Sequence, residues 1–298
     1  CQIELSNDEL ILLSAVNNFE SKIDNSKILY SASDEDSNIR ELGNVVIDNR
    51  PEQSLSRYKL FFSEYIGNYI QTNVYINYIY SANGKDWKRN ESYIINRPLE
   101  DPYVIIHDNI YYLFAEDKFD VPFRNIRRYH SADGLEWIDD GDVLDITEAN
   151  HYEDRDVSSP TVMIQDDFWF MYYEGRGHEW YGSINLAKSS DGLNWNKMHE
   201  TNPAYYPRKL EIEWDYKTAV RDDLLFFNEH YYIIYHGIGY MNFYSVGLLS
   251  STNLKKWYRI NNLPLANLND LMWLQADSTM HFIFQGDNKT INSIEVTI

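Results

Sequence analysis

The sequence predicts an all-β fold, specifically a five-bladed β-propeller with blades of about four antiparallel strands. Short runs rich in aromatic and β-branched residues, closed by Asp-Gly or Asn-Gly turns, recur along the 298 residues. Such runs are typical of antiparallel strands. No segment shows sustained helical periodicity. A unit of three strand runs followed by the same turn motif recurs along the chain, which indicates an array of blades.

The turn motif has the pattern Ser-x-[Asp/Asn]-Gly-x-x-Trp, and its Gly is lost in the last copy. Its four copies are about 50 to 62 residues apart, an interval typical of propeller blades. Because the Trp recurs in every copy, we expect it to pack between blades. We expect the Asp of each turn to be structural. The copies end at Trp87, Trp137, Trp195 and Trp257.

The blades are expected in chain order. Four of them occupy about 39–92, 93–143, 144–200 and 201–260, and 261–298 supplies most of a fifth. The expected first strands are Gly43–Ile47, Pro102–Ile106, Val157–Ile164, Ala219–Phe227 and Leu271–Gln275. The expected second strands are Tyr58–Phe62, Ile110–Ala115, Phe168–Tyr173, Tyr231–His236 and His281–Gln285. The expected third strands are Val74–Ser81, Ile126–His130, Ser183–Lys188, Ser245–Ser250 and Ile291–Val296.

The N-terminal segment is expected to close the ring. Glu9–Val16 and Lys27–Ala32 are its candidate strands, and Lys27–Ala32 resembles the third strand of the first blade. Pairing of N-terminal and C-terminal strands seals many propellers because it removes exposed edges. Since the repeats run nearly end to end without a linker, we expect residues 1–298 to form a single domain.

The composition excludes several classes of function. A net charge of −20 argues against a nucleic-acid partner and against anionic membrane surfaces. A single cysteine excludes an intramolecular disulfide, and no run of eighteen apolar residues predicts a transmembrane segment. The 25 tyrosines suit both a large β core and a sugar-binding surface.

The chain begins at Cys1. A cleaved signal or lipoprotein leader would leave a cysteine first, and a cloned fragment would explain it equally well. We expect an extracytoplasmic protein, whether secreted, periplasmic or anchored as a lipoprotein through Cys1.

Acidic residues gather where first strands begin and second strands end. Innermost strands of a propeller line its axial channel, so these positions should converge on one mouth. Crowded carboxylates repel one another, and the least solvated have raised pKa values. Glycoside hydrolysis needs that setting, with one carboxyl protonated and another ionised. The relevant segments are Arg40-Glu41, Glu100-Asp101-Pro102, Asp156–Pro160 and Arg221–Asp223 at first strands, and those ending at Glu64, Glu116, Glu174 and His236-Gly237 on second strands.

A family resemblance supports this interpretation. Glu100-Asp101-Pro102, Asp156-x-x-x-Pro160-x-Val162, Met171-Tyr172-Tyr173-x-Gly175 and the turn motif resemble the five-bladed β-propeller glycoside hydrolases. These include the arabinanase and xylosidase, the invertase and levansucrase, and the mannoside phosphorylase families. The resemblance covers about 39–260 and implies an oligo- or polysaccharide substrate.

The resemblance also implies three acids on successive blades. In arabinanase-like families these are a base Asp, a pKa-tuning Asp and an acid Glu. Asp101 matches the tuning position. Asp156 or Glu174 is the expected proton donor, with Glu153 and Asp154 as competitors. Glu41 or Asp36 is the expected base on the first blade, where Asp34 is a further acid, and inverting chemistry is favoured by analogy alone.

Other residues are candidates for substrate binding. Trp180 and Tyr181 could stack against sugar faces. Asp222 could act in the site or hold the rim through an ion pair with Arg221. A phosphorylase would need a cationic phosphate subsite, for which Arg40, Arg155, Arg176 and Arg221 are the rim candidates. A Tyr, Tyr103, stands where the mannoside phosphorylases carry an Arg. His236 could bind substrate or an ion in the channel.

Three functions are therefore kept open: hydrolysis of glycosidic bonds, non-catalytic glycan binding, and phosphorolysis. No cofactor is expected to be required. Gly-rich phosphate loops and His-Glu-x-x-His are absent from the sequence. Clustered carboxylates and carbonyls suit a hard cation, so a structural Ca²⁺ in the axial channel is a further expectation.

Overall fold

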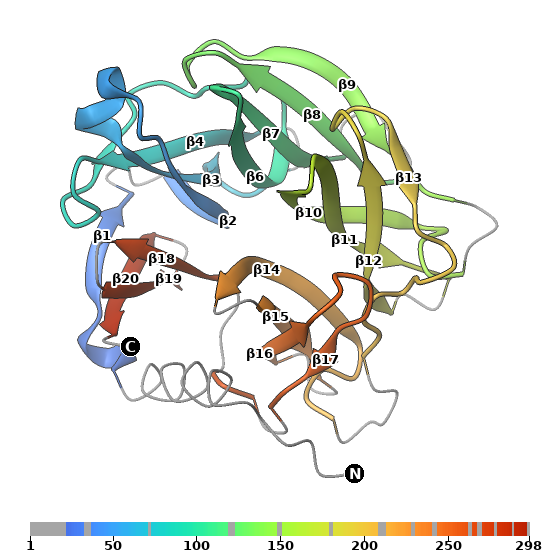
Figure 1. Ribbon diagram of the computed structural model, residues 1–298. Coiled ribbons are helices and arrows are strands. Elements are labelled where there is room, and N and C mark those ends of the chain that lie inside the picture. Colours follow the sequence, from blue (N-terminus) through green and yellow to red (C-terminus); the bar gives the residue numbers. More distant parts are fainter. Residues whose placement is uncertain are drawn as a thin grey trace.

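The computed structural model confirms the five-bladed β-propeller, with blades of four antiparallel strands (Figure 1). It describes residues 22–32, 37–70, 73–118, 123–147, 151–178, 181–207, 213–227, 230–239, 243–261, 264–266, 270–276, 279–287 and 289–296. The candidate strand Glu9–Val16 and the acids Asp34 and Asp36 lie outside these residues. Among the described residues, no helix is long and apolar enough to cross a membrane.

Each blade is one meander in chain order. Blade 1 contains β2 (Ser37–Ile47), β3 (Tyr58–Ile66), β4 (Val74–Ser81) and β5 (Lys88–Arg89). Blade 2 contains β6 (Leu99–His107), β7 (Ile110–Asp117), β8 (Asn125–Ser131) and β9 (Ile138–Leu144). Blade 3 contains β10 (Asp156–Gln165), β11 (Phe168–Arg176), β12 (Gly182–Ser189) and β13 (Trp195–Lys197). Blade 4 contains β14 (Thr218–Phe227), β15 (His230–Ile238), β16 (Tyr244–Ser251) and β17 (Tyr258–Arg259).

Blade 5 closes the ring. It joins β18 (Leu271–Ala276), β19 (Thr279–Asp287) and β20 (Thr290–Val296) to the N-terminal β1 (Lys27–Ser31). The pairing of β1 with β20 confirms the expected closure by Lys27–Ala32, with Lys27 opposite Ser293. The described residues also contain two short 3₁₀ helices, η1 (Ile23–Asn25) and η2 (Pro51–Ser56).

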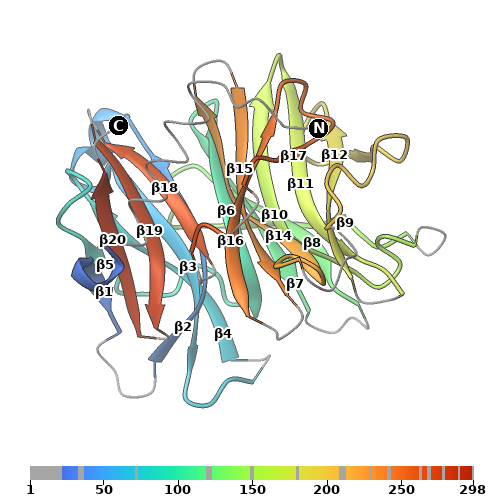
Figure 2. The ribbon, with the colours of Figure 1, turned by 90° about the horizontal axis from the view of Figure 1, so that it is seen from below.

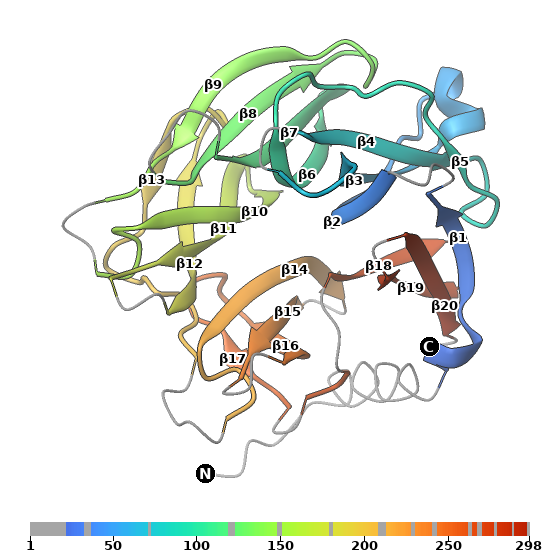
Figure 3. The ribbon, with the colours of Figure 1, turned by 180° about the vertical axis from the view of Figure 1, so that it is seen from behind.

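The first strand of every blade is innermost. In both face-on views, β2, β6, β10, β14 and β18 lie nearest the centre of the ring (Figure 1, Figure 3). The strands extend from one face of the ring to the other (Figure 2). Second strands run antiparallel to first strands, so the end of β7 pairs with the start of β6 and the end of β11 with the start of β10. These positions therefore share one face of the ring, as the sequence predicted.

The hydrophobic core is divided among five clusters, each lying between two neighbouring blades. The motif tryptophans pack in these layers. Trp137 of blade 2 meets Phe61 of blade 1 edge-on at 6.3 Å, and Trp195 of blade 3 meets Phe114 of blade 2 at 5.9 Å. The structural role predicted for the repeated Trp is confirmed.

In all four copies of the turn motif one Asp or Asn side chain accepts two backbone N–H groups, and in the first three the Trp indole also donates to the Gly carbonyl. In the third copy the Asp191 carboxylate accepts the N–H groups of Leu193 and Asn194, and Trp195 Nε1 donates to the Gly192 carbonyl. In the fourth copy Leu254 replaces the Gly but keeps its left-handed conformation, with φ of 62°. Its carbonyl accepts from the Tyr172 hydroxyl at 2.7 Å, so the backbone group stays bonded without the indole.

Candidate functional site

A pocket of about 240 Å³ opens at the axis and is lined by all five blades. We call it the axial pocket. Its walls are the starts of the first strands and the ends of the second strands, together with a few residues beyond them. Charged side chains dominate the lining. They are the acids Glu41, Asp101, Glu116, Glu174, Asp222 and Asp270, and the bases Arg40, Lys118, Arg124, Arg176, Arg221 and His236.

Four of the five first strands contain a bulge close to the residues that line the axial pocket. The pairing register shifts at 39–41 in β2, 100–103 in β6, 158–161 in β10 and 221–223 in β14. Asp101 and Ser159, at two of the bulges, have φ of 50° and 48°. Bulges re-aim side chains and are common beside active sites, and non-glycine residues with positive φ store strain that often marks function.

A chain of contacts links four blades across the pocket. The Arg221 Nε of blade 4 donates to the Ser159 carbonyl of blade 3 at 2.7 Å. The Ser159 hydroxyl donates to Asp101 of blade 2 at 2.5 Å. Glu41 of blade 1 lies close enough to Asp101 for each of the two carboxyls to shift the pKa of the other. The bulged residues therefore converge on the Asp101 carboxylate.

Glu41 and Asp101 form a carboxyl pair with opposite pKa shifts. Burial, followed by the negative charges of Asp101 and Glu100, raises the pKa of Glu41 well above its usual range. Burial alone would raise the pKa of Asp101 as well. The Arg221 charge, the neighbouring Glu41 and the hydrogen bond from Ser159 instead hold it below its usual range. One acid is therefore protonated beside an ionised partner, which is the arrangement that separates a proton donor from a carboxylate.

Two further glutamates occupy equivalent ends of second strands but differ in charge state. Burial raises the pKa of Glu116 to about 7, against the lowering effect of Arg124 and Lys118. Glu174 is also buried, but Arg176 and the hydroxyl of Thr218 lower its pKa. Its oxygens accept from Arg176 at 2.8 Å, Thr218 at 2.9 Å and Ser158 at 3.0 Å. Glu174 is therefore an ionised carboxylate held in one orientation.

The sequence of this chain matches no protein-family model and no curated protein. Its fold does match solved structures. A glycosyl hydrolase from Bacteroides ovatus has a TM-score of 0.67 over 90% of this chain and 91% of its own, at 11% identity. The β-1,2-mannobiose phosphorylase from Listeria innocua, in complex with β-1,2-mannobiose, has a TM-score of 0.67 over 91% of this chain and 94% of its own, at 12% identity.

A third similar structure is of the GH130 family of mannoside phosphorylases, described as containing glycoside hydrolases that target β-1,2 mannosidic linkages in Candida mannan. Its TM-score is 0.66 over 88% of this chain and 84% of its own, at 13% identity. This chain shares the five-bladed β-propeller fold of these structures. The resemblance inferred from Glu100-Asp101-Pro102 and the turn motif is therefore confirmed at the level of the fold. At 11–13% identity, the roles of individual residues must come from this chain's own geometry.

Within this propeller, the residues predicted from the sequence divide into three groups. Trp180 lies outside the described residues. Arg155, Asp156 and Tyr181 do not line the axial pocket. Tyr181 lines a second cavity beside blade 3, and Asp156 accepts the backbone N–H of Arg124 at 3.1 Å. The residues that line the axial pocket are Glu41, Asp101, Glu174, Arg40, Arg221, Asp222 and His236.

Strand pairing shows why Asp156 does not line the axial pocket: Ser158 lies opposite Glu174 as Glu100 lies opposite Glu116, so the residue equivalent to Asp101 is Ser159. Asp101-Pro102 and Ser159-Pro160 are equivalent pairs, because both first residues have positive φ and both sit at a register shift. Ser159 therefore occupies in blade 3 the position that Asp101 occupies in blade 2. Alignment on the two X-Pro pairs, rather than on the acids, would have shown this.

Several pocket residues were given no role from the sequence. Glu116 was aligned with Glu174 but not assigned, and Lys118, Arg124 and Asp270 were not considered. Lys118 follows Glu116 by two positions, as Arg176 follows Glu174, and its amine lies 3.0 Å from Glu116. A repeated Glu-x-[Lys/Arg] at the ends of second strands was the signal that could have identified Lys118.

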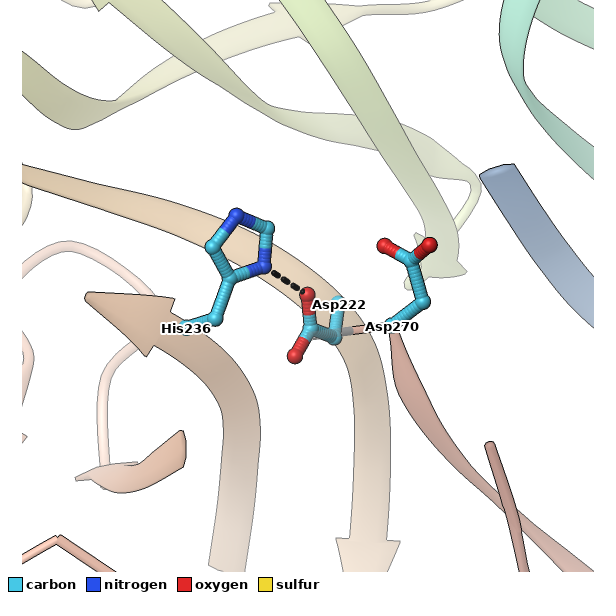
Figure 4. Close-up of side chains that lie close together, drawn as sticks. All are labelled: Asp222, His236 and Asp270. Atoms are coloured by element: carbon cyan, nitrogen blue, oxygen red, sulfur yellow. Dashed lines mark hydrogen bonds and ion pairs between the residues drawn. The ribbon is translucent and has the colours of Figure 1, made fainter. Parts of the chain in front are cut away.

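Asp222, His236 and Asp270 form a cluster at one side of the pocket. Figure 4 shows Asp222 between the other two side chains, with the His236 Nδ1 directed at its carboxylate at 2.5 Å. Burial lowers the pKa of His236, but the Asp222 charge outweighs it and raises that pKa to about 9. His236 is therefore a cation at neutral pH and donates its Nδ1 proton to Asp222.

The same cluster bears on the expected Ca²⁺ ion. Each of its three residues offers one ligand atom, and these atoms lie within 4.8 Å of one another. Ca²⁺ takes about six to eight oxygen ligands, whereas this cluster supplies two carboxylates and one imidazole nitrogen. The donor set suits a hard cation only in part, so calcium stays a prediction.

We expect the free energy of unfolding to decrease as the pH rises from 6.5 through about 9. The pKa of His236 is higher in the folded protein than its ordinary value of 6.5, so its contribution is complete below pH 6.5 and lost above about 9. The loss should amount to about 3 kcal/mol at most. Urea denaturation at pH 6.5 and 9.5 measures it. His236→Gln should show a smaller decrease than the exposed control His199→Gln, and equal decreases would contradict this role.

Proposed function

We propose that this chain is a carbohydrate-active enzyme that cleaves glycosidic bonds in the axial pocket, with Glu41 as the proton donor. The observation that carries the proposal is the Glu41–Asp101 pair, in which a protonated acid and an ionised carboxylate share one pocket. Glycosidic cleavage requires a carboxyl that is protonated at the working pH and transfers its proton to the leaving oxygen as the bond breaks.

The roles differ from those suggested by the sequence. There Glu41 was the expected base and Glu174 a candidate donor. The raised pKa of Glu41 suits proton donation, and the lowered pKa of Glu174 suits an ionised base. We therefore assign water activation to Glu174. Asp101 keeps the tuning role expected of it, because its charge contributes to the raised pKa of Glu41.

A carbohydrate substrate fits the lining of the pocket. Carboxylates and guanidinium groups from five blades can bind several hydroxyl groups at once. Tyr244, at the rim, is 46% exposed and offers a ring face on which a sugar can stack. The solved structures with this fold that are named above act, by their names, on glycosides, which supports the same substrate class here.

Phosphorolysis is the second candidate, and the basic residues of the pocket favour it. Arg40, Lys118, Arg124, Arg176 and Arg221 all line the axial pocket. Guanidinium groups match the geometry of phosphate oxygens. An incoming phosphate would replace water as the attacking group, and Glu41 would still protonate the leaving oxygen.

A substrate screen tests both candidates. Purified protein is offered a panel of aryl glycosides together with plant, bacterial and host polysaccharides, each with and without inorganic phosphate. Turnover without phosphate supports hydrolysis, and turnover that requires phosphate, with a sugar phosphate as product, supports phosphorolysis. If a glycan binds equally to wild type and Glu41→Gln and nothing is turned over, the protein is a glycan-binding propeller and the proposal fails.

A further inference from the structure

We propose that a second cavity, beside blade 3, binds further sugar residues of the glycan whose terminal part occupies the axial pocket. This inference rests on the proposed function, because it assumes that the axial pocket takes a sugar. The second cavity has a volume of about 500 Å³ and a lining rich in aromatic rings. Its described lining consists of His151, Tyr152, Asp154, Gly177, His178, Tyr181 and Tyr206.

The volumes of the two cavities indicate which part of a glycan each can hold. Small-molecule pockets usually have volumes of about 300–1,000 Å³. The axial pocket, at about 240 Å³, falls below that range and has room for only part of an oligosaccharide. The second cavity, at about 500 Å³, lies within it. A glycan longer than the axial pocket must extend to a neighbouring surface, and the second cavity has room for further sugar residues.

The two cavities are continuous along the backbone of blade 3. Arg176 lines the axial pocket, and Gly177 and His178, the next residues, line the second cavity. The backbone N–H of Arg155 donates to the Arg176 carbonyl at 3.0 Å, and the Arg155 side chain contacts His178 Nδ1 at 3.0 Å. Residues 154–155 thus lie alongside residues 176–178, between the two cavities. A glycan that leaves the axial pocket over Arg176 therefore reaches the second cavity next.

The lining has the chemistry of a sugar site. Tyr152 is 39% exposed and meets the Tyr206 ring edge-on at 5.8 Å, so the two rings form a corner. The Tyr181 hydroxyl is bonded to that of Tyr216 at 3.0 Å, which fixes the ring of Tyr181. Tyrosine faces pack against the apolar faces of sugar rings. The Asp154 carboxylate and the imidazole of His151 supply acceptors and donors for hydroxyl groups.

The wall of the second cavity is preformed. Glu153, which separates Tyr152 from Asp154 in the sequence, is fully buried. Its carboxylate accepts a hydrogen bond from the Tyr173 hydroxyl at 2.6 Å and lies 3.2 Å from the Lys197 amine. The backbone at His151 rests directly on Gly177, where a Cβ would lie 1.6 Å from the His151 carbonyl oxygen. A fixed wall binds its ligand without the entropy cost of ordering a loop.

Chain-length dependence of catalysis tests the proposal. The substrates are the aryl monoglycoside turned over best in the screen and the oligosaccharides of that sugar with two to five residues. In the wild type, kcat/KM should rise with length. Tyr152→Ala and Tyr206→Ala should each lose about tenfold in kcat/KM toward the longer substrates, with the aryl monoglycoside unchanged. Tyr152→Trp, which keeps a stacking face, should retain most of the wild-type value.

Tyr258→Ala is the matched control, since Tyr258 is 65% exposed on β17 of blade 4, away from both cavities. It should behave as wild type. Equal chain-length dependence in Tyr152→Ala and wild type overturns the second site while leaving the proposed function intact. If no substrate is turned over, the proposed function fails, and glycan binding then tests whether the second cavity is a sugar site. Affinity electrophoresis in gels containing yeast mannan, arabinan or xylan should then retard wild type more than Tyr152→Ala, and equal or absent retardation overturns the proposal.

Discussion

Replacement of Glu41 by Gln is expected to lower kcat by about 10²–10⁴-fold toward natural glycosides, whose leaving oxygen must be protonated. Gln has nearly the same shape, but it has no acidic proton to transfer. Glu41 is neutral in the native pocket because burial and the charges of Asp101 and Glu100 disfavour its ionised form. The substitution therefore removes the proton and little else.

The leaving group separates this role from a structural one. Dinitrophenolate departs without protonation, so Glu41→Gln should lose less than about tenfold in kcat toward dinitrophenyl glycosides. Methyl or natural glycosides should show the full loss. Glu52→Gln is the control on the same blade, because the Glu52 side chain is 64% exposed in η2. Equal losses for both leaving groups would show that Glu41 is not the donor and would direct attention to Glu116, whose pKa is about 7.

The architecture was predictable because it is encoded by local, repeated chemistry. Each copy of the turn motif uses the same carboxylate or amide to accept two backbone N–H groups, as Asp133 and Asp191 do. The motif tryptophans contact the preceding blade, so the spacing of the motif reports the spacing of blades. Even the closing strand carried a local signal, since Lys27–Ala32 repeats the pattern of a third strand.

From the sequence, the axial pocket could be placed at the ends of particular strands, but the residue of each strand that faces it could not always be identified. Glu41, Asp101 and Glu174 were placed correctly at one mouth, because the alternation of strand direction brings first-strand starts and second-strand ends together. The bulges were not visible, since a one-residue shift in pairing leaves no mark on a hydrophobic pattern. Ser159, and not Asp156, faces the pocket from blade 3, and its only mark in the sequence is the proline that follows both Asp101 and Ser159.

Charge states depend on neighbours from other blades and could not be read from any one segment. The pKa of Glu41 is raised by Asp101, which is 60 positions away, and that of Asp101 is lowered by Arg221, another 120 positions on. Lys118 and Arg124 bring their charges from the end of a second strand and from a segment beyond it. The sequence therefore identified carboxyls with catalytic potential and assigned their roles in the opposite order from the one we propose.

Asp101→Asn is expected to lower kcat by about 10²–10³-fold, a magnitude typical of losing one preorganised electrostatic contact in an active site. Asn keeps the size of the side chain and can still accept from the Ser159 hydroxyl, but it removes the negative charge beside Glu41. Without that charge the protonated form of Glu41 is less favoured, so the pKa of Glu41 decreases.

The pH dependence of kcat/KM is the measurement that distinguishes this mechanism from simple damage to the pocket. A proton donor is active below its pKa, so the alkaline decline in rate reports the ionisation of Glu41 in the free enzyme. In Asp101→Asn that decline should begin at a lower pH than in wild type, because the charge that held the proton on Glu41 is gone. Ser159→Ala serves as the companion variant, since it removes a hydrogen bond to Asp101 and leaves the charge in place. The pH of the alkaline decline in kcat/KM is compared between Ser159→Ala and Asp101→Asn. A decline shifted to lower pH only in Asp101→Asn identifies the Asp101 charge as the group that tunes Glu41, whereas an unshifted decline in both variants would refute the coupling between the two carboxyls.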